Sequence, residues 1–344
     1  MARAAAANSL LLKTEEARLL VALRQAGIEA IAVKGTSLAR LLSRDATSRF
    51  CGDVDLVVRE ADVFKAGEVL HAAGYESRLW PRLLTHPPFL RDADEHTSEV
   101  VYLRRFAGAS VLVELHWRPL HLPGLLLWNS MESYEVESGS APIRTLDPAM
   151  YLLLLCGHVS GHGWAGLRWL CDVADFLVRF EGRIEPSRFL KLCDLAGLRR
   201  RAGTTFALLE AYFGIRWAAA EKLSSSRVRR DARRYFRRPL APVAPAQPAA
   251  VHWERIRLQD SALRRMRYLL WLLRPTHTEW VKQIRSEGQV QYALRPGWSA
   301  YLVRLTRLLG MIGPIPWVRP AAANSDAVIL PAEASPHPAP GGGE

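Results

Sequence analysis

The sequence predicts an α+β protein: an N-terminal α/β domain with a mixed sheet, followed by an all-α C-terminal domain. Short strand-like segments alternate with amphipathic helical segments up to about residue 120, the pattern of an α/β unit. From Asp147 onward the chain reads as a series of longer helices. Charge separates the halves too, because residues 1–150 carry 17 basic and 19 acidic side chains whereas residues 151–344 carry 29 and 15.

In the N-terminal half, the spacing of apolar residues predicts each element. Thr14 precedes an amphipathic segment with acids in its first turn and Gly27 follows it, so we expect a helix over 14–26 with Thr14 as its N-cap. Further helices are expected over 38–43 and 61–74. Strands are expected over 28–33, 53–59, 98–106 and 110–117. The last two strands are close enough in the chain to form a hairpin.

The C-terminal half is predicted to be helical and basic. Helices are expected over 148–161, 167–180, 186–197, 204–214, the basic block 254–273 and a final segment near 300–310. The Pro-rich segment 239–250 is typical of a linker or an exposed loop. These patterns predict a first domain over 1–140, a helical domain over 141–318 and a disordered tail over 319–344.

Composition excludes several classes of protein. The chain is 49% hydrophobic and 23% charged, which supports a sizeable core and excludes global disorder. Its four cysteines form no C-x-x-C pair, so free thiols in a reducing compartment are expected rather than a zinc finger. The N-terminal segment lacks the apolar core of a signal peptide, and the longest uncharged stretch, 148–167, contains two His and four Gly. We therefore expect a cytoplasmic protein with no membrane span.

The residues that point to chemistry follow one buried strand and lie on two others. Gly35 follows the first strand, where the absence of a side chain lets the backbone approach a ligand, and Thr36 and Ser37 add hydroxyl donors suited to phosphate. Asp53 and Asp55 stand at i and i+2, so a strand directs both carboxylates to one side. Glu114, on a neighbouring strand, offers a third carboxylate. Three hard oxygen ligands beside a phosphate cradle suit Mg²⁺.

These segments resemble the nucleotidyltransferase superfamily built on the DNA polymerase β fold. The resemblance is carried by I-A-V-K-G-T-S-L, R-F-C-G-D-V-D-L-V-V, L-H-A-A-G-Y and V-E-L-H-W. More narrowly, the chain is similar to a bacterial family of uncharacterised nucleotidyltransferases, and the similarity continues through H-V-S-G-H-G-W-A-G-L-R-W-L-C-D-V and a late L-R-P. It extends over most of residues 14–310.

The resemblance implies roles for particular residues. Asp53 and Asp55 would bind the metal ions, and Glu114 would act as the third ligand or as the base for the attacking hydroxyl. Gly35 and Thr36 would hold the nucleotide phosphates, and Arg49 would neutralise phosphate charge. Lys34 and Ser37, next to them in the sequence, are further candidate phosphate contacts. Two departures stand out: Gly35-Thr36 replaces the usual Gly-Gly or Gly-Ser, and Glu114 stands where Asp is more common.

The function that the resemblance implies is transfer of an NMP from an NTP to an acceptor, with Mg²⁺ or Mn²⁺ as cofactor and release of pyrophosphate. The acceptor is left open: a small molecule, a sugar, a peptide, a protein or RNA. The main alternative is a non-catalytic module that binds nucleotides or nucleic acid through the basic half. Arg227–Arg238, with seven Arg in twelve residues, is either such a contact or a solvated helix face.

Simpler structural roles remain open for each candidate. Asp53 and Asp55 also suit a solvated strand end, and Gly35 to Ser37 an ordinary turn. Glu114 also suits a cross-strand ion pair, and Lys34 a surface charge that points away from the site. His116 is expected to pack the strand end or to contact a base. His158 and His162, at i and i+4, could bind zinc with Asp172 in a hydrolase, but the glutamate of an H-E-x-x-H motif is missing, so a structural or acceptor-site role is favoured.

Overall fold

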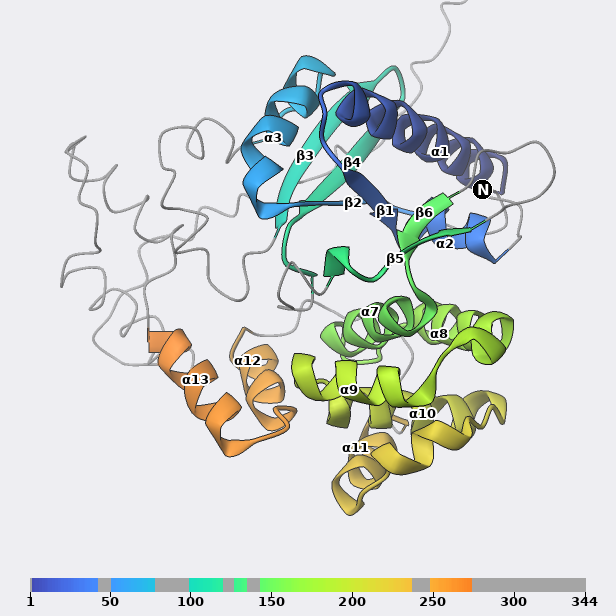
Figure 1. The fold of residues 1–344 in the computed structure, drawn as a ribbon, viewed down its shortest axis with the longest axis vertical. Helices are drawn as coiled ribbons and strands as arrows, with labels where there is room; N and C mark the ends of the chain where they lie inside the picture. Colours follow the sequence, from blue (N-terminus) through green and yellow to red (C-terminus); the bar gives the residue numbers. More distant parts are fainter. Residues whose placement is uncertain are drawn as a thin grey trace, which may run out of the picture.

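A computed structural model describes residues 2–42, 51–77, 99–119, 127–134, 143–236 and 248–273. The predicted fold class is confirmed: a mixed sheet with flanking helices precedes a helical C-terminal part (Figure 1). Several predicted features lie outside the described residues: Arg49, most of the Pro-rich segment, the final helix near 300–310 and the tail 319–344.

The sheet has four strands in the order β1-β2-β4-β3. They are β1 (Ala30–Val33), β2 (Val54–Val58), β3 (Glu99–Phe106) and β4 (Ala109–His116). The central pair, β2 and β4, is parallel, while β1 with β2 and β3 with β4 are antiparallel. The predicted hairpin of β3 and β4 is therefore confirmed, and Gly108 at its turn has φ +77, a backbone conformation that glycine adopts at no steric cost.

One face of the sheet is covered by α1 (Ala2–Gln25) and α3 (Val63–Ala72). The core on this side contains the even-numbered β2 residues Val54, Leu56 and Val58. The prediction that Thr14 caps this helix was wrong. Alanine-rich sequence before it has high helix propensity, so the helix begins at Ala2, and the Thr14 hydroxyl donates to the Leu10 carbonyl one turn back, at 2.9 Å.

The opposite face of the sheet packs against the helical part, which lies below the sheet in Figure 1. Ile31, Val33 and Val57 share a single core cluster with α7 residues such as Met150 and Leu153. Because strand side chains alternate between faces, the odd-numbered residues of β2 point toward these helices. Any odd-numbered polar residue of β2 therefore faces the junction between the two parts.

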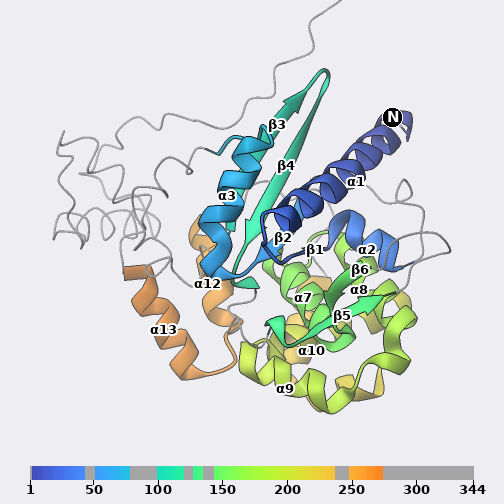
Figure 2. The same cartoon turned by 45° about the horizontal axis from the view of Figure 1, so that its top comes forward.

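The helical part begins after a hairpin that the sequence did not predict, β5 (Met131–Tyr134) with β6 (Ile143–Leu146). Asp147 then caps α7, accepting hydrogen bonds from the backbone N–H groups of Ala149 and Met150. The helices that follow are α7 (Pro148–Gly161), α8 (Leu167–Phe180), α9 (Pro186–Ala196), α10 (Arg199–Phe213), α11 (Ser226–Phe236), α12 (Pro248–Arg257) and α13 (Ala262–Leu273). Figure 2 shows α7 to α10 gathered beneath the sheet.

The predicted basic block 254–273 is interrupted, so that α12 and α13 are separate helices. Asp260 lies at the break, and its carboxylate accepts hydrogen bonds from the backbone N–H groups of Arg199 and Arg200, at 2.8 and 2.9 Å. These are two of the free donors at the start of α10, so the break caps another helix. Within the described ranges, no helix has both the length and the apolar character needed to cross a bilayer.

Candidate active site

The strand register brings two of the predicted carboxylates together. In the parallel pair, Asp55 on β2 stands opposite Glu114 on β4, and on its other side it stands opposite Val33 on β1. Asp55 is 2% exposed, so its carboxylate is held in the middle of the sheet and away from bulk water. Such burial is costly unless the charge is paired.

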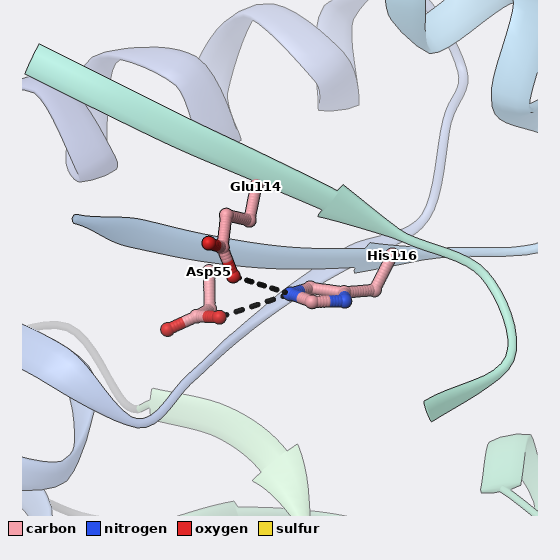
Figure 3. A group of neighbouring side chains, drawn as sticks. All are labelled: Asp55, Glu114 and His116. Atoms are coloured by element: carbon pink, nitrogen blue, oxygen red, sulfur yellow. Dashed lines mark hydrogen bonds and ion pairs between the residues drawn. The ribbon is translucent and has the colours of Figure 1, made fainter. Parts of the chain in front are cut away.

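His116 provides part of that pairing. Its Nε2 atom lies 2.9 Å from Asp55 Oδ1 and 3.4 Å from Glu114 Oε2, so both carboxylates converge on one ring nitrogen (Figure 3). Its Nδ1 atom lies 3.2 Å from Glu99 Oε2. We did not predict a place for His116 in this cluster, although it stands two residues after Glu114 and so had to share its face.

Lys34 supplies the second cation, and its position depends on a strained turn. Its φ and ψ are 56 and −151, a region that residues other than glycine rarely occupy. Its backbone N–H donates to the Tyr151 hydroxyl of α7 at 2.8 Å, and its ammonium Nζ lies 2.5 Å from Asp55 Oδ1. Tyr151 of the helical part thus holds the turn after β1 in place, and the Lys34 ammonium points at Asp55.

The two cations decide the charge of Asp55. Burial alone would raise the pKa of Asp55, but the Lys34 ammonium and the His116 hydrogen bond outweigh it and hold that pKa well below its usual range. Burial also works against the charged form of His116, yet hydrogen bonds with Asp55 and Glu114 raise its pKa to about 9. Burial likewise opposes the charge on Lys34, and attraction to Asp55 raises its pKa instead. Asp55 is therefore an ionised carboxylate between two protonated partners.

Asp53 behaves differently. It lies one residue before β2, on the same side of the strand as Asp55. Burial raises its pKa to about 6, with further contributions from the charges of Asp55 and Glu114. An added positive charge would relieve this repulsion, so the environment of Asp53 favours a bound cation.

The turn after β1 also shows where the predicted phosphate ligands lie. Gly35 has φ +39, and a Cβ atom there would lie 3.3 Å from the Asp53 carbonyl oxygen, so glycine permits the close approach of the two segments. Thr36 and Ser37 are buried behind the turn: the Thr36 hydroxyl donates to the buried Glu16 carboxyl, and the Ser37 hydroxyl donates to the Ala32 carbonyl at 3.1 Å. The structure thus brings Lys34 and Gly35, but not these two hydroxyls, to the carboxylates.

A cavity of about 160 Å³ lies between the sheet and the helical part. On the sheet side it is lined by Asp53, Asp55 and Glu114 together with Lys34 and Gly35. The opposite wall consists of His158 and His162 from α7 and Arg168 and Trp169 from α8. We had not predicted a site role for Arg168 or Trp169, because the crossing of α7 and α8 over the sheet is a long-range feature without a local signal.

The two histidines do not form the zinc site considered above. Their ring centroids are 4.7 Å apart in an edge-to-face arrangement, and both rings contact Trp169. Among the described residues, Asp55, Glu114 and His116 are the single group of three or more potential ligands whose atoms converge, within 4.8 Å of one another. In the part of the chain that the structure describes, neither His158 nor His162 belongs to a group of three side chains that could hold a metal ion.

The Arg-rich segment forms α11, which has a buried and an exposed side. Val228, Asp231, Ala232 and Tyr235 face inward, and the Asp231 carboxylate pairs with Arg200 and Arg257. The arginines of the helix itself, residues 227, 229, 230, 233 and 234, are exposed. Arg237 and Arg238 lie outside the described residues. The helix therefore presents a basic surface, while its acidic residue serves internal packing.

The mixed sheet, the strained strand-to-helix turn and the converging carboxyl groups agree with the nucleotidyltransferase class that the sequence resembles. A family model described as "Uncharacterised nucleotidyltransferase" matches residues 1–214, more than half of the 344-residue chain. The chain belongs to this family, and the resemblance found in its motifs is confirmed as far as residue 214. The matched range includes both walls of the cavity. No curated protein matches the chain.

The donor set of the cluster fits a hard divalent cation. Asp55 and Glu114 offer carboxylate oxygens within reach of one ion, and Asp53 lines the same cavity. Mg²⁺ prefers such oxygens together with water and substrate phosphate. Imidazole nitrogen suits softer metals, so His116 is better placed as the hydrogen-bond donor that orients both carboxylates than as a magnesium ligand.

Proposed function

We propose that the protein is a Mg²⁺-dependent nucleotidyltransferase, with Mn²⁺ as an alternative ion, that moves an NMP from an NTP to an acceptor and releases pyrophosphate. The observation that carries the proposal is the register that pairs Asp55 with Glu114 in a cavity shared with Asp53. Membership of a nucleotidyltransferase family supports it.

In this proposal Asp53 and Asp55 hold the ion, and Glu114 acts as a further ligand or as the base. A bound ion would supply a Lewis acid that polarises the α-phosphate and offsets the charge of the leaving pyrophosphate. The acceptor oxygen forms a bond to the α-phosphorus while the bond to the bridging oxygen breaks, and pyrophosphate leaves with that electron pair. With Glu114 as the base, its carboxylate takes the proton of the acceptor hydroxyl.

Phosphate binding is assigned to the turn after β1. Lys34 and Gly35 line the cavity, so they are the proposed contacts. Thr36 and Ser37, whose hydroxyls donate inward, support the turn in this proposal rather than touching phosphate. Arg49 remains a predicted phosphate ligand outside the described residues. The acceptor class stays open among small molecules, sugars, peptides, proteins and RNA, and the exposed arginines of α11 would suit a nucleic acid.

A transfer assay tests the proposal. Each of the four α-labelled NTPs is incubated with Mg²⁺ or Mn²⁺ and with host lysate separated into small-molecule, protein and RNA fractions. The wild type runs beside Asp53→Asn/Asp55→Asn and beside the control Asp62→Asn, which removes a carboxylate outside the cavity. We expect label in one fraction with the wild type and the control, and none with the double variant.

Two results would contradict this expectation. Label transfer that survives in the double variant would show that these carboxylates are not the catalytic ones. Metal-dependent nucleotide binding without transfer to any fraction would favour the non-catalytic module, whose binding should also weaken steeply with salt if the basic helices make the contacts.

A further inference from the structure

One wall of the cavity is an array of rings whose role the proposed function leaves open. It consists of His158, His162 and Trp169, which we call the aromatic wall. The rings of His162 and Trp169 are stacked, with centroids 3.9 Å apart and planes at 18°. His158 stands edge-on to both, at 4.7 and 5.8 Å. The side chain of His162 is exposed, so the stack ends at an accessible ring.

From the structure of the cavity we infer that the aromatic wall is the seat of the nucleobase, which adds a further ring to the stack of Trp169 and His162. The inference rests on the proposed function, because it takes the substrate of the carboxylates to be an NTP. The aromatic wall and the carboxylates line one cavity, so a single substrate that reaches both must carry a planar ring and a phosphate chain. A nucleotide has both, and base stacking on aromatic side chains tolerates any base.

The local backbone is built to place Trp169. A Cβ atom on Gly166 would lie 2.7 Å from the Trp169 ring, closer than such contacts allow, so only glycine leaves room for the ring where it stands. Trp164 has φ 53, a strained value for a residue with a side chain, and it is held by burial and by a hydrogen bond from its Nε1 to the Thr205 hydroxyl at 2.9 Å. Strain that surrounding contacts maintain is typical of ligand sites.

The charges around the aromatic wall suit a base next to phosphates. Desolvation by the cavity walls, together with the nearby charges of Lys34 and Arg168, lowers the pKa of His162 and so favours its neutral ring. A neutral imidazole stacks without the cost of desolvating a charge. Arg168 lines the same cavity and lies within electrostatic reach of both His162 and Asp53.

Two probes separate base binding from phosphate binding. Titration calorimetry compares the α,β-methylene analogues of the four NTPs, which cannot transfer, with inorganic tripolyphosphate, which has no base, each with Mg²⁺. We expect His162→Ala to weaken the best-bound nucleotide analogue about tenfold and to leave tripolyphosphate unchanged, as loss of one stacking contact implies. His162→Phe, which keeps a stacking ring, should retain the affinity, and His71→Ala on the exposed side of α3 is the matched control.

Gly166→Ala gives a second test that changes no ring. The added methyl group displaces Trp169, so we expect a loss of nucleotide affinity in the same direction as in His162→Ala, again without effect on tripolyphosphate. The inference would be overturned if His162→Ala and Gly166→Ala left nucleotide affinity unchanged, or if they weakened nucleotide and tripolyphosphate binding equally. Neither result would contradict the proposed function. If both probes bind the wild type and Asp53→Asn/Asp55→Asn equally well, or if neither probe binds the wild type, the proposed function is contradicted and the inference with it.

Discussion

The Nζ atom of Lys34 lies 2.5 Å from Oδ1 of Asp55, and His116 Nε2 lies 2.9 Å from the same oxygen. One carboxylate oxygen in the centre of the sheet is therefore already paired with two cations of the protein itself. A divalent ion that binds Asp55 through this oxygen has to displace the ammonium. Metal binding should accordingly be weak until a substrate that attracts Lys34 is present, since phosphate offers the ammonium another partner.

Replacement of Lys34 tests this competition. Lys34→Met removes the ammonium but keeps an unbranched, flexible side chain that is one atom shorter. We therefore expect Mn²⁺ affinity in the absence of nucleotide to rise at least about tenfold, because a nearby like charge has been removed. Titration of Mn²⁺ followed by electron paramagnetic resonance measures this directly. Lys65→Met, on the exposed side of α3, is the control and should not change Mn²⁺ affinity. Weaker Mn²⁺ binding in Lys34→Met would show that the ammonium supports the ion rather than competing with it.

Tyr151 ties the helical part to the strained turn. In Tyr151→Phe the backbone N–H of Lys34 loses its acceptor, and we expect a loss of about 1–3 kcal/mol in the free energy of unfolding together with weaker nucleotide binding. Urea unfolding and calorimetry measure the two effects. Tyr134→Phe also removes a buried tyrosine hydrogen bond, to the Leu146 carbonyl, so it should lower stability without changing nucleotide affinity. Equal nucleotide affinity in both variants would contradict a role for Tyr151 in shaping the site.

Gly35 and Gly108 form a matched pair of positions for a test of the turn after β1. Both have positive φ, so alanine at either position costs about 1–2 kcal/mol in backbone strain. At Gly108 nothing lies within 4 Å of the added Cβ, whereas at Gly35 it meets the Asp53 carbonyl at 3.3 Å. We expect similar thermal destabilisation in the two variants but loss of nucleotide-analogue affinity in Gly35→Ala alone. Retained affinity in Gly35→Ala would show that the approach of the two segments is not needed for binding.

Glu16 makes stability depend on pH through a raised pKa. Burial raises the pKa of Glu16 to about 7, although hydrogen bonds from the Thr36 hydroxyl and the Ser37 backbone N–H act in the other direction. Below pH 4.5 the group is protonated in both the folded and the unfolded chain; between pH 4.5 and 7 the unfolded chain binds fewer protons, so stability falls as pH rises. Above pH 7 the cost is constant at about 3 kcal/mol. Glu16→Gln should therefore gain stability relative to the wild type as pH rises from 5 to 8.

The adjacent Glu15 makes stability depend on pH in the opposite direction. Burial acts to raise its pKa, but hydrogen bonds with Arg18 and Tyr75 outweigh this and lower it, so its contribution to stability is present at neutral pH and lost as pH falls through the folded pKa. Glu15→Gln should consequently lose stability relative to the wild type at pH 8 and lose less at pH 4. Chemical unfolding of both variants across this range measures the difference. Parallel pH profiles for the two variants would contradict the assignment for Glu16.

Much of the strand framework could be predicted because it depends on short-range pattern. The period of two places Asp55 on a defined face of β2, and the same rule applied to Glu114 and His116 places them together once the strands are paired. The start of α1 could not be predicted from Thr14, because a good capping residue inside an alanine-rich segment is overridden by propensity. The strands of the β5–β6 hairpin have four residues each, too few to show a period.

The second wall of the cavity lay beyond sequence reasoning for a different reason. His162 and Trp169 acquire their position only when α7 and α8 cross the odd-numbered face of the sheet, and no local pattern encodes that crossing. The separation of α12 from α13 likewise follows from Asp260 capping α10, a contact between segments about 60 residues apart. Residue types indicated the candidate side chains on the strands, and tertiary packing determined which helical residues face them across the cavity.

The alternation of β2 side chains between the two faces of the sheet limits which insertions and deletions the protein can tolerate. Asp55 and Val57 face the helical part, whereas Leu56 and Val58 lie in the core with α1 and α3. Inserting a single codon between Val54 and Asp55 would exchange these two sets, burying the carboxylate among leucines and presenting aliphatic side chains to the cavity. Length changes of one residue in β2 or β4 should thus be far more damaging than most substitutions. Changes of two residues keep each side chain on its face but move Asp55 along the strand relative to Glu114. The site therefore depends on the odd or even position of each residue along the strand as well as on its identity.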